Sequence, residues 1–541
     1  MLRLHQLTVT LDEYPNMDEN MLRRLCASRL RIKEDRIAQV RLQKRSVDAR
    51  GRDGVHFTVT ADVLLKDAAG EEKIAQKFKP NQVGYLPARK METSPDVFAL
   101  KLPPWPEGRR RPLVVGAGPA GLFCALALAV RGARPVLIDR GRPVEQRARD
   151  IDALEADGVL DPESNVLFGE GGAGAFSDGK LTCGLNSPHI RTVLQTLYRC
   201  GAPEEILQSQ KPHIGTDELR KVLINARREL IRLGAEVRFG CRLTGLALKD
   251  GRVTAAQIAE HGQPGEIETE DVYLAIGHSA RDTYQWLHDM GLPMQQKPFA
   301  IGVRIEHLQR EINRAQYGRD AGHPALPPAE YKLNVPTPDN RGVYTFCMCP
   351  GGQVINASSE AGGVNVNGMS HHARSGRNAN AAVLVGVRPE DFGSDHPLAG
   401  VDFQRRIERA AFAATGDLRA PCQRVEDLIS GKATIAAGSV TPTYKPGVVF
   451  GDIRCCLPDF VTDNLRAALP ALGRRLRGFD WPDALLTAPE TRSSAPLRML
   501  RNERRESPIG GLYPLGEGAG YAGGIVSAAV DGLCAGMGEI A

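Results

Sequence analysis

The segment from Arg111 to Gly141, RPLVVGAGPAGLFCALALAVRGARPVLIDRG, constrains the fold of this 541-residue chain more than any other. A short apolar strand runs into Gly116, Gly118 and Gly121, which fit the pattern G-x-G-x-x-G and open an apolar helix. These glycines permit a tight turn, a close approach of a pyrophosphate, and close packing of helix against strand. The helix N-terminus then directs free amides at the phosphate charge. A second strand ends at Asp139, whose carboxylate can accept from ribose hydroxyls. The pattern predicts a Rossmann-like unit that binds a dinucleotide, NAD or FAD.

Two segments before residue 280 fit a flavoprotein. EVRFGCRLTGLALKDGRVTAAQI, residues 236–258, predicts a strand and a hairpin, and DVYLAIG predicts a strand that returns to the sheet and ends at Gly277. FGEGGAGAFSDGKL, residues 168–181, is rich enough in glycine for its main chain to lie flat against the flavin end of FAD. An ordinary hairpin and a flexible loop are the alternative interpretations.

The C-terminal segment GLYPLGEGAGYAGGIVSAAVDGLCAG, residues 511–536, distinguishes FAD from NAD. It predicts a strand that ends at Glu517, a glycine-rich turn and a helix that opens at GGIVSAAVDG. The carboxylate can accept from a ribityl chain, and the helix N-terminus would stabilise negative charge on a reduced flavin. NAD-dependent dehydrogenases have no use for such an element, so its presence favours FAD.

Residues 1–95 predict a small α+β module, with a ferredoxin-like β-α-β-β start as the best interpretation. LRLHQLTVTL reads as a strand, and Met21, Leu22, Leu25 and Leu30 follow helical spacing behind an Asp18 cap. IAQVRLQKRSVDA and GVHFTVTADVLL predict two strands joined by a turn at RGRDG. The Pro- and Arg-rich residues that follow predict a linker over 96–112.

The expected fold class is therefore α/β: a Rossmann-like FAD-binding domain with an inserted, mainly β substrate domain, plus the N-terminal module. We expect the FAD-binding domain over residues 113–190 and 191–285, the inserted domain over 286–500 and a C-terminal FAD-binding element over 501–541.

Several polar residues of the middle region are candidates for chemistry. In PFAIGVRIEH, alternation places Arg304 on a face that meets either a pocket or solvent. Cys347 and Cys349 could exchange electrons with a flavin, although positions i and i+2 of a strand are awkward for a strain-free disulfide and the alternative is simple packing. His371 could act as a general acid, with Arg374 and other polar neighbours binding an anionic or carbonyl substrate, although such a His-His pair is more often at the surface.

Near the C-terminus, Arg492 and Arg498 either face the active-site cavity or lie in a solvated basic loop. Cys455 and Cys456 are expected in the core.

Composition excludes several classes of protein. The net charge of +5, from 69 basic and 64 acidic residues, does not argue for nucleic-acid binding. The N-terminus lacks the apolar core of a secretory signal, and no apolar run is long enough to cross a bilayer. Eleven cysteines are scattered without the spacing of a disulfide scaffold or a zinc site. We therefore expect a cytoplasmic protein that binds no metal and acts on a small molecule.

Taken together, VVGAGPAGL…LIDRG, GEGGAGAFSDGKL, FCMCPGGQVI, NGMS, PETRSSAPLRM and GLYPLGEGAGYAGGIVSAAVDG make the chain resemble a bacterial family of FAD-dependent dehydrogenases, often labelled NAD(FAD)-utilising dehydrogenases. The resemblance covers nearly the whole chain and implies a glutathione-reductase-like FAD fold, but it does not identify a substrate. Glu517 stands where many flavoproteins have Asp. Since the chain has one full dinucleotide fingerprint, NAD(P)H is expected only as a transient electron donor.

The sequence and the resemblance together lead to the following expected FAD contacts: Gly116, Gly118, Pro119, Ala120, Gly121, Asp139, Arg140, Gly171, Gly172, Gly174, Ala175, Phe176, Ser177, Lys180, Leu243, Ala275, Gly277, Glu517, Gly518, Gly523, Gly524 and Ile525. The candidates for catalysis are Lys180, Cys347, Cys349, His371, Arg374 and Arg498.

The expected function is an FAD-dependent oxidoreductase that transfers a hydride through flavin N5 to or from a small-molecule substrate. One alternative is a flavin monooxygenase. Another is a non-catalytic FAD-binding protein that senses redox state, with an N-terminal module that could dock a protein partner.

Overall fold

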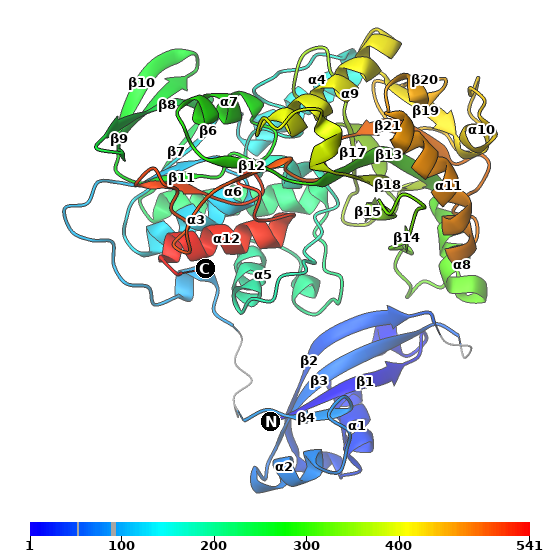
Figure 1. Cartoon of the computed structure of the whole chain (residues 1–541). Coiled ribbons are helices and arrows are strands. Elements are labelled where there is room, and N and C mark those ends of the chain that lie inside the picture. Colours follow the sequence, from blue (N-terminus) through cyan, green and yellow to red (C-terminus); the bar gives the residue numbers. More distant parts are fainter. Residues whose placement is uncertain (51–53, 88–93, 541) are drawn as a thin grey trace.

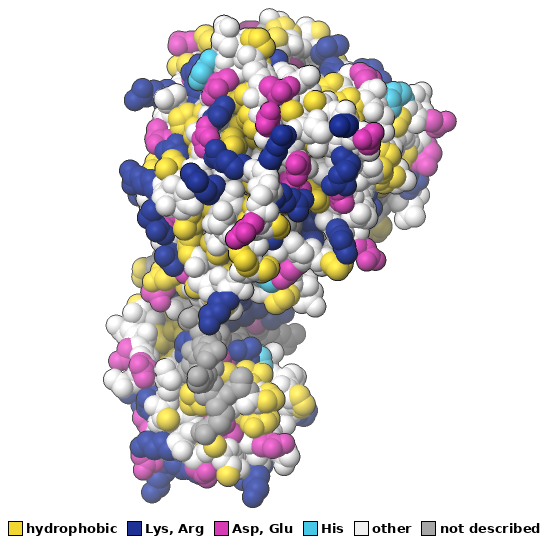
Figure 2. Space-filling model, turned by 90° about the vertical axis from the view of Figure 1, so that its left-hand side faces the viewer, with side chains coloured by type: hydrophobic (Ala, Val, Ile, Leu, Met, Phe, Trp, Pro, Cys, Tyr) yellow, Lys and Arg dark blue, Asp and Glu magenta, His cyan; other side chains and the backbone are white. Residues whose placement is uncertain are grey.

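The computed structural model describes residues 1–50, 54–87 and 94–540 and places a small N-terminal lobe beside a larger body (Figure 1). On the face drawn in Figure 2, basic and acidic side chains are interspersed over both parts. Within the described ranges, no helix combines the length and the apolar character needed to cross a bilayer.

The N-terminal lobe has the predicted α+β character. Its antiparallel sheet has the order β2-β3-β1-β4. Asp18 caps the first helix by accepting from Met21 N, and this helix buries Leu22, Cys26 and Leu30, as its apolar spacing predicts. The predicted turn RGRDG lies partly outside the described residues. The elements are β1 (Leu2–Val9), α1 (Glu19–Leu30), β2 (Ile37–Asp48), β3 (His56–Leu65), α2 (Ala69–Ala75) and β4 (Val83–Tyr85).

Strand β2 attaches this lobe to the body. Arg45 N donates to Gln208 O at 2.8 Å, and Gln210 N donates to Arg45 O at 2.8 Å. The guanidinium of Arg45 also forms an ion pair with Glu205 at 3.1 Å. The lobe is therefore held through backbone as well as side-chain contacts.

The body is built on a parallel sheet of order β23-β11-β5-β6-β7, as the dinucleotide-binding motif predicts. On one face, Val114, Leu137 and Tyr273 pack under the helices. On the other face, Leu113 and Ile138 pack under an antiparallel sheet. Both faces are apolar because both are covered. The strands are β5 (Leu113–Val115), β6 (Val136–Asp139), β7 (Glu236–Phe239), β11 (Val272–Leu274) and β23 (Leu512–Pro514), and the helices of this region are α3 (Pro119–Val130), α4 (Val144–Asp157), α5 (His189–Arg199), α6 (Thr216–Arg232) and α12 (Ile525–Met537).

The covering sheet contains the predicted hairpin of β8 (Cys241–Lys249) and β9 (Arg252–Glu260). It also contains β10 (Gln263–Glu268), a strand that the sequence analysis missed because QPGEIE is polar and almost wholly exposed. Helix α7 (Arg281–Asp289) follows the return strand β11.

The segment predicted as a mainly β inserted domain is of mixed composition, so that description is wrong in part. Its large sheet has the order β14-β15-β18-β13-β21-β19-β20, but helices cover it. The long helices were missed because charged runs such as QRRIERA resemble solvated segments. The elements are β12 (Met294–Gln296), β13 (Phe299–Leu308), α8 (Gln309–Tyr317), β14 (Asn334–Val335), β15 (Val343–Cys349), β16 (Gln353–Asn356), β17 (Val366–Met369), β18 (Asn378–Val387), α9 (Ala399–Thr415), β19 (Ala420–Arg424), α10 (Val425–Ser430), β20 (Val448–Phe450), α11 (Asp459–Arg475), β21 (Leu485–Glu490) and β22 (Leu497–Met499).

Candidate functional site

The glycine motif forms a turn that tolerates no side chain at its first and third glycines, Gly116 and Gly121. Gly116 has φ +98°, and a Cβ there would meet Ala275 O at 2.4 Å. A Cβ at Gly121 would meet Gly116 O at 1.8 Å, so helix α3 can approach the strand only through glycine. Gly118 caps α3 with no side-chain hydrogen bond, which leaves the first amides of the helix available to an anion.

Asp139 stabilises this turn. Its carboxylate is buried and accepts from Ala117 N at 2.7 Å and from Gly141 N at 2.8 Å. Because the carboxylate joins the ends of both β5 and β6, it fixes the geometry of the turn. Each oxygen keeps a second lone pair for another donor.

The glycine-rich loop lies between the N-termini of two helices. Gly171 N donates to Ala117 O at 2.9 Å, which ties the loop to the first turn. A Cβ on Gly172 would lie 3.3 Å from the Cα of Gly118, and one on Gly174 would lie 3.0 Å from the Ile525 side chain at the start of α12. Three sequence segments predicted to share one ligand are therefore neighbours in the structure.

Other expected contacts lie within or around this junction. Ala120, Ala175, Leu243 and Ala275 are buried. Phe176 is also buried, and its ring packs against the guanidinium groups of Arg147 and Arg220, so its side chain belongs to the core. Pro119 begins α3, and Ser177 Oγ donates to Gly174 O at 2.8 Å.

At the C-terminal element, the Glu517 side chain is half-buried. Burial is the main cause that raises the pKa of its carboxyl group to about 7, while Lys297 and the Gly524 amide oppose the shift. Gly518 approaches Gly277 so closely that a Cβ would meet Gly277 O at 2.5 Å. Gly523 and Gly524 border open space, and Gly524 caps α12 without a side chain.

Arg140 is already engaged with protein groups. It forms ion pairs with Glu163 at 2.7 Å and with Asp282 at 2.8 Å, and it stacks over Phe168. A cavity of about 320 Å³ adjoins it and is also lined by Ser279 and other residues. Arg140 therefore lies at the wall of a cavity next to the Asp139 turn.

Four of the predicted residues meet Glu490 around β15, and we call Lys180, Arg304, Cys347, Cys349 and Glu490 the cysteine cluster. Cys347 adopts φ +42°, an unusual conformation for a residue with a side chain, within an irregular stretch of pairing between Phe346 and Cys349. Arg304 donates to Cys347 O at 2.7 Å, and Lys180 donates to Met348 O. Two cations thus hold the carbonyls of the unusual residue and of the residue after it.

The two thiols of the cysteine cluster differ in acidity. A hydrogen bond from Cys349, with the nearby charges of Lys180 and Arg304, lowers the pKa of Cys347 to about 6 against the effect of burial. The same hydrogen bond and burial raise the pKa of Cys349. Cys347 is therefore the more acidic thiol of the pair.

Arg304 and Glu490 form a buried ion pair that is poorly satisfied by hydrogen bonds. Arg304 is fully buried, so it meets neither solvent nor an open pocket, and its Nε lies 3.0 Å from Glu490 Oε2. Neither of these atoms makes a well-directed hydrogen bond within the described chain. Burial raises the pKa of Glu490 to about 7, because the attraction of Arg304 does not compensate for lost hydration.

The remaining candidates for catalysis are dispersed. Arg374 forms a buried ion pair with Asp178 at 2.5 Å, next to Lys180, which lies 3.2 Å from the same carboxylate. His371 is exposed, with Asp217 at 3.9 Å. Arg498 is exposed and stacks over Tyr521 at 5.0 Å. The sequence analysis missed Asp178 and Glu490, although both lie in segments that it quoted.

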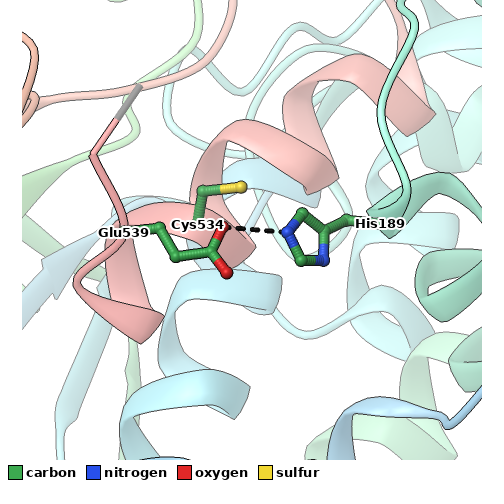
Figure 3. Close-up of side chains that lie close together, drawn as sticks. All are labelled: His189, Cys534 and Glu539. Atoms are coloured by element: carbon green, nitrogen blue, oxygen red, sulfur yellow. Dashed lines mark hydrogen bonds and ion pairs between the residues drawn. The ribbon is translucent and has the colours of Figure 1, made fainter.

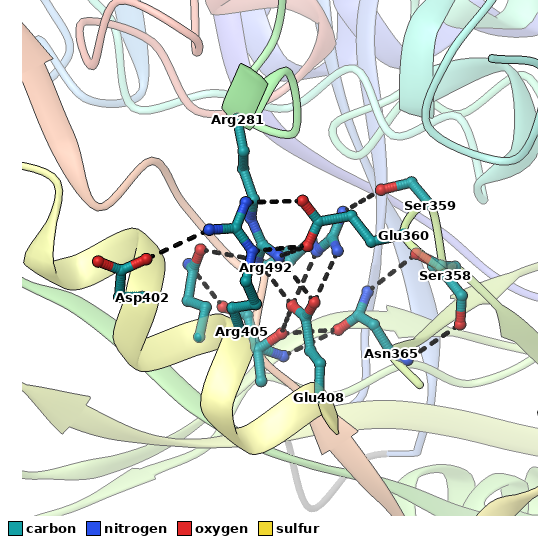
Figure 4. A network of polar contacts seen from close by, with 12 residues as sticks. Arg281, Ser358, Ser359, Glu360, Asn365, Asp402, Arg405, Glu408 and Arg492 are labelled. Carbon is teal, nitrogen blue, oxygen red and sulfur yellow. Dashed lines mark hydrogen bonds and ion pairs between the residues drawn. The ribbon is translucent and has the colours of Figure 1, made fainter. Parts of the chain in front are cut away.

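Arg492 lies in another buried network, shown in Figure 4. Glu408 on α9 accepts from Arg492 at 2.7 Å and 2.9 Å, and from Arg281 of α7 at 2.8 Å. Thr491 Oγ1 adds a hydrogen bond of 2.6 Å. The two arginines lower the pKa of Glu408 well below its ordinary value despite burial. Glu408 therefore joins α7, α9 and the segment after β21, and Arg492 does not lie in a solvated loop.

One group of possible metal ligands occurs among the described residues: His189, Cys534 and Glu539 (Figure 3). His189 Nε2 lies 2.8 Å from Glu539 Oε2, a distance that a hydrogen bond explains. Burial raises the pKa of Cys534 to about 12, which opposes the thiolate form that a metal requires. These side chains do not need a metal to account for their arrangement.

All eleven cysteines lie in the described part of the chain and are free thiols, most of them buried. The expectation that Cys455 lies in the core is wrong: Cys455 is exposed, and only its neighbour Cys456 is buried.

Comparison with known proteins adds the family. Residues 298–493 match the model of the FAD-dependent protein, C-terminal domain-like family, and residues 1–64 match a domain of unknown function, DUF8436. An "Uncharacterized protein" of Clostridium beijerinckii is 42% identical over 535 residues, which cover 98% of this chain and 97% of the relative.

Among solved structures, a geranylgeranyl bacteriochlorophyll reductase-like protein of Thermoplasma acidophilum is 15% identical, with a TM-score of 0.33, over 78% of this chain and 76% of that one. The quinol fumarate reductase protein FrdA of E. coli is 12% identical, with a TM-score of 0.35, over 79% and 69%. Similarities at this level do not identify a function.

The chain is a mixed α/β protein that carries the C-terminal domain of FAD-dependent proteins. It belongs to the same family as the clostridial relative, with which it shares nearly its whole length.

Proposed function

We propose that this protein binds FAD and is an FAD-dependent oxidoreductase that transfers a hydride to or from a small-molecule substrate. The observation that carries the proposal is the junction of Gly118, Gly172 and Ile525, where two uncapped helix N-termini and a glycine-rich loop meet. The match to a family of FAD-dependent proteins supports the choice of cofactor.

The residues at the junction fit the parts of FAD. The turn from Gly116 to Gly121 would offer backbone amides to the pyrophosphate, because the close backbone contacts at Gly116 and Gly121 bring the N-terminus of α3 against the strand. Asp139 is oriented by its two amide donors and keeps lone pairs for ribose hydroxyls.

The C-terminal element provides the electrostatics. FAD, when bound, supplies two-electron chemistry at its isoalloxazine ring. The N-terminus of α12 would stabilise negative charge there through its free amides. Glu517, whose pKa is about 7, can hold or release a proton near neutral pH, with Lys297 close enough to affect that equilibrium. The protein thus contributes binding, orientation and proton storage.

The N-terminal lobe is best described as ferredoxin-like, because its elements follow the order β-α-β-β-α-β with the antiparallel sheet order β2-β3-β1-β4.

FAD binding is tested with the full-length chain. We expect the purified protein to carry flavin or to bind added FAD, observed as flavin absorbance that remains after gel filtration. Gly121→Ala should lower the affinity at least about 100-fold, because an added Cβ would meet Gly116 O at 1.8 Å. Gly184→Ala is the matched control, since a Cβ at Gly184 would meet nothing within 4 Å. A full-length protein that is folded but binds no FAD would overturn the proposal.

Anaerobic reduction then separates the kinds of flavoprotein. We expect the flavin spectrum to bleach with a metabolite substrate, or with NADH or NADPH as transient donors. Oxygen consumption that depends on both NAD(P)H and a substrate would instead identify a monooxygenase. Flavin that none of these compounds reduces would identify a non-catalytic, redox-sensing protein.

A further inference from the structure

We propose that Cys347 and Cys349 form a dithiol–disulfide pair that exchanges electrons with a small disulfide-containing compound on the substrate side of the flavin site. The proposal deepens the proposed function, on which it depends for the second redox partner. It names the class of substrate and the residues that react with it.

The backbone brings the two sulfurs together. In a regular strand, Cα atoms two residues apart are separated by about 6.6 Å, near the upper limit for a disulfide. Here the left-handed conformation of Cys347, φ +42°, interrupts the pairing of β15 with β18 between Phe346 and Cys349. Cys349 Sγ donates to Cys347 O at 3.3 Å, so its side chain folds back toward its neighbour.

The surroundings select Cys347 as the attacking thiol. Lys180 and Arg304 bind the carbonyls of Met348 and Cys347, which keeps both cations beside the thiol. Cys347 is partly exposed and Cys349 is buried, so an incoming compound reaches Cys347 first. The pKa of Cys347, about 6, agrees with this assignment.

The cluster is adjacent to the flavin site. Lys180 lies at the end of the glycine-rich segment, in which Gly172 approaches Gly118 and Gly171 N donates to Ala117 O. The charge on Cys347 contributes to the raised pKa of Glu517, on the element that would meet the flavin ring. The same charge also contributes to the raised pKa of Glu490. The pair is therefore placed to pass electrons to or from the cofactor.

The reaction balances as thiol–disulfide exchange. The Cys347 thiolate attacks a disulfide, forms a mixed disulfide and releases one thiolate of the compound. Cys349 then loses its proton to that leaving group, attacks the Cys347 sulfur and releases the second thiolate. The sum converts one protein thiolate, one protein thiol and one external disulfide into one protein disulfide, one external thiol and one external thiolate, which takes its proton from water. The two electrons and two protons that restore the protein dithiol come from the reduced flavin cofactor of the proposed function.

Mass spectrometry of the full-length protein tests the bond. Trypsin cleaves after Arg341 and Arg374, and the peptide of residues 342–374 contains Cys347 and Cys349 as its only cysteines. After incubation with oxidised glutathione and then iodoacetamide, we expect this peptide to be two hydrogen atoms lighter than the dithiol and unalkylated. Dithiothreitol should restore two alkylation sites. A peptide that stays doubly alkylated at every glutathione ratio overturns the proposal.

Variants assign the roles of the two thiols. Cys349→Ser should retain glutathione on Cys347 as a stable mixed disulfide, because the second attack is lost. Cys347→Ser should form neither bond. Cys455→Ser is the control and should leave the result unchanged, since Cys455 lies on an exposed segment away from the cluster's contacts. Equal glutathionylation of both single variants would contradict the assignment.

The pH profile tests the charges. The groups that face Cys347 are Lys180 and Asp178 on the glycine-rich loop, Arg304 on β13, Glu490 on β21, Glu517 and Cys349. We expect alkylation of Cys347 to rise through a pKa near 6 and to be about three- to tenfold slower at pH 6.5 in Lys180→Met. Cys455 in the same samples serves as the internal control. An unchanged profile in Lys180→Met would contradict the electrostatic role.

These measurements need no bound flavin, so their outcome is separate from that of FAD binding. If the protein binds FAD but never forms the disulfide, the proposed function stands and the dithiol–disulfide proposal is overturned. Protein that forms the disulfide but binds no FAD loses the proposed function.

Discussion

Two buried arginine–glutamate contacts in this protein differ in how well they are satisfied. Glu408 receives hydrogen bonds from Arg281, Arg492 and Thr491 (Figure 4). Glu490 has Arg304 at 3.0 Å, but its Oε2 lacks a directed hydrogen bond among the described residues. The pKa of Glu408 is accordingly lowered, and that of Glu490 is raised to about 7.

The difference shows why burial alone does not reveal a role. A buried carboxylate with enough donors stays ionised and joins elements of the fold. One with too few donors stays near its titration point, where a change in neighbouring charge can alter its protonation. Glu408 joins α7 to α9, whereas Glu490 lies beside the Cys347 thiolate.

The largest expected effect is that of Glu408→Gln. The substitution leaves Arg281 and Arg492 as buried charges without their shared carboxylate, and we expect a loss of about 3–5 kcal/mol in the free energy of unfolding. Urea unfolding at pH 7, followed by far-UV circular dichroism, measures it. A loss below about 1 kcal/mol would mean that the network does not hold the helices together.

A smaller effect is expected at Glu490. Its contribution to stability changes with pH in the opposite direction to that of Glu408. Its folded-state pKa, about 7, is above the ordinary value of 4.5, so the folded protein keeps a proton that the unfolded chain releases. Stability from this group therefore falls as pH rises from about 4.5 to about 7.

Glu490→Gln removes this dependence. We compare the free energies of unfolding of the variant and the unmodified protein. Their difference should change in favour of the variant by about 1–3 kcal/mol as pH rises from 5 to 8. Glu408, whose pKa is lowered, instead contributes stability that is lost as pH falls below about 4.5. Urea unfolding at both pH values checks the sign, and a variant with an unchanged pH slope would contradict the distinction between the two carboxylates.

The smallest effect is expected at the edge of the Glu408 network. Arg405 forms an ion pair with Glu360 at 2.8 Å, but both side chains are about 30% exposed. Arg405→Ala should cost no more than about 1 kcal/mol, since solvent screens such pairs. The same urea experiment measures it, and a loss as large as that of Glu408→Gln would show that the network cannot be divided into centre and edge.

Much of the fold follows from local sequence. The turn at Gly116 and Gly121 and the strand ending at Asp139 were predictable because their spacing is fixed by the close contacts of one β-α-β unit. The hairpin of β8 and β9 was predictable from its alternation and its Asp-Gly turn. The polar strand β10 and the charged helix α9 were not, because tertiary contacts decide their structure.

The candidate site divides in the same way. Glycine patterns locate the proposed cofactor cradle, but neither the pairing of Arg492 with Glu408 nor the burial of Arg304 could be read from the sequence. Arg281, Glu408 and Arg492 are separated by 127 and 84 positions, and only the folded chain brings them together. Cys347 was recognised as a candidate, but its conformation, which decides its chemistry, has no local sequence signal.

The attachment of the N-terminal lobe has a consequence for association between copies of this chain. Strand β2 lies at one edge of its sheet, and an uncovered edge offers unpaired amides and carbonyls to strands of other molecules. Arg45 uses its free edge to bond Gln208 and Gln210, while the opposite edge ends in the short strand β4. Docking therefore occupies the edge of β2 around Arg45, where it removes an amide and a carbonyl that another strand could otherwise pair with.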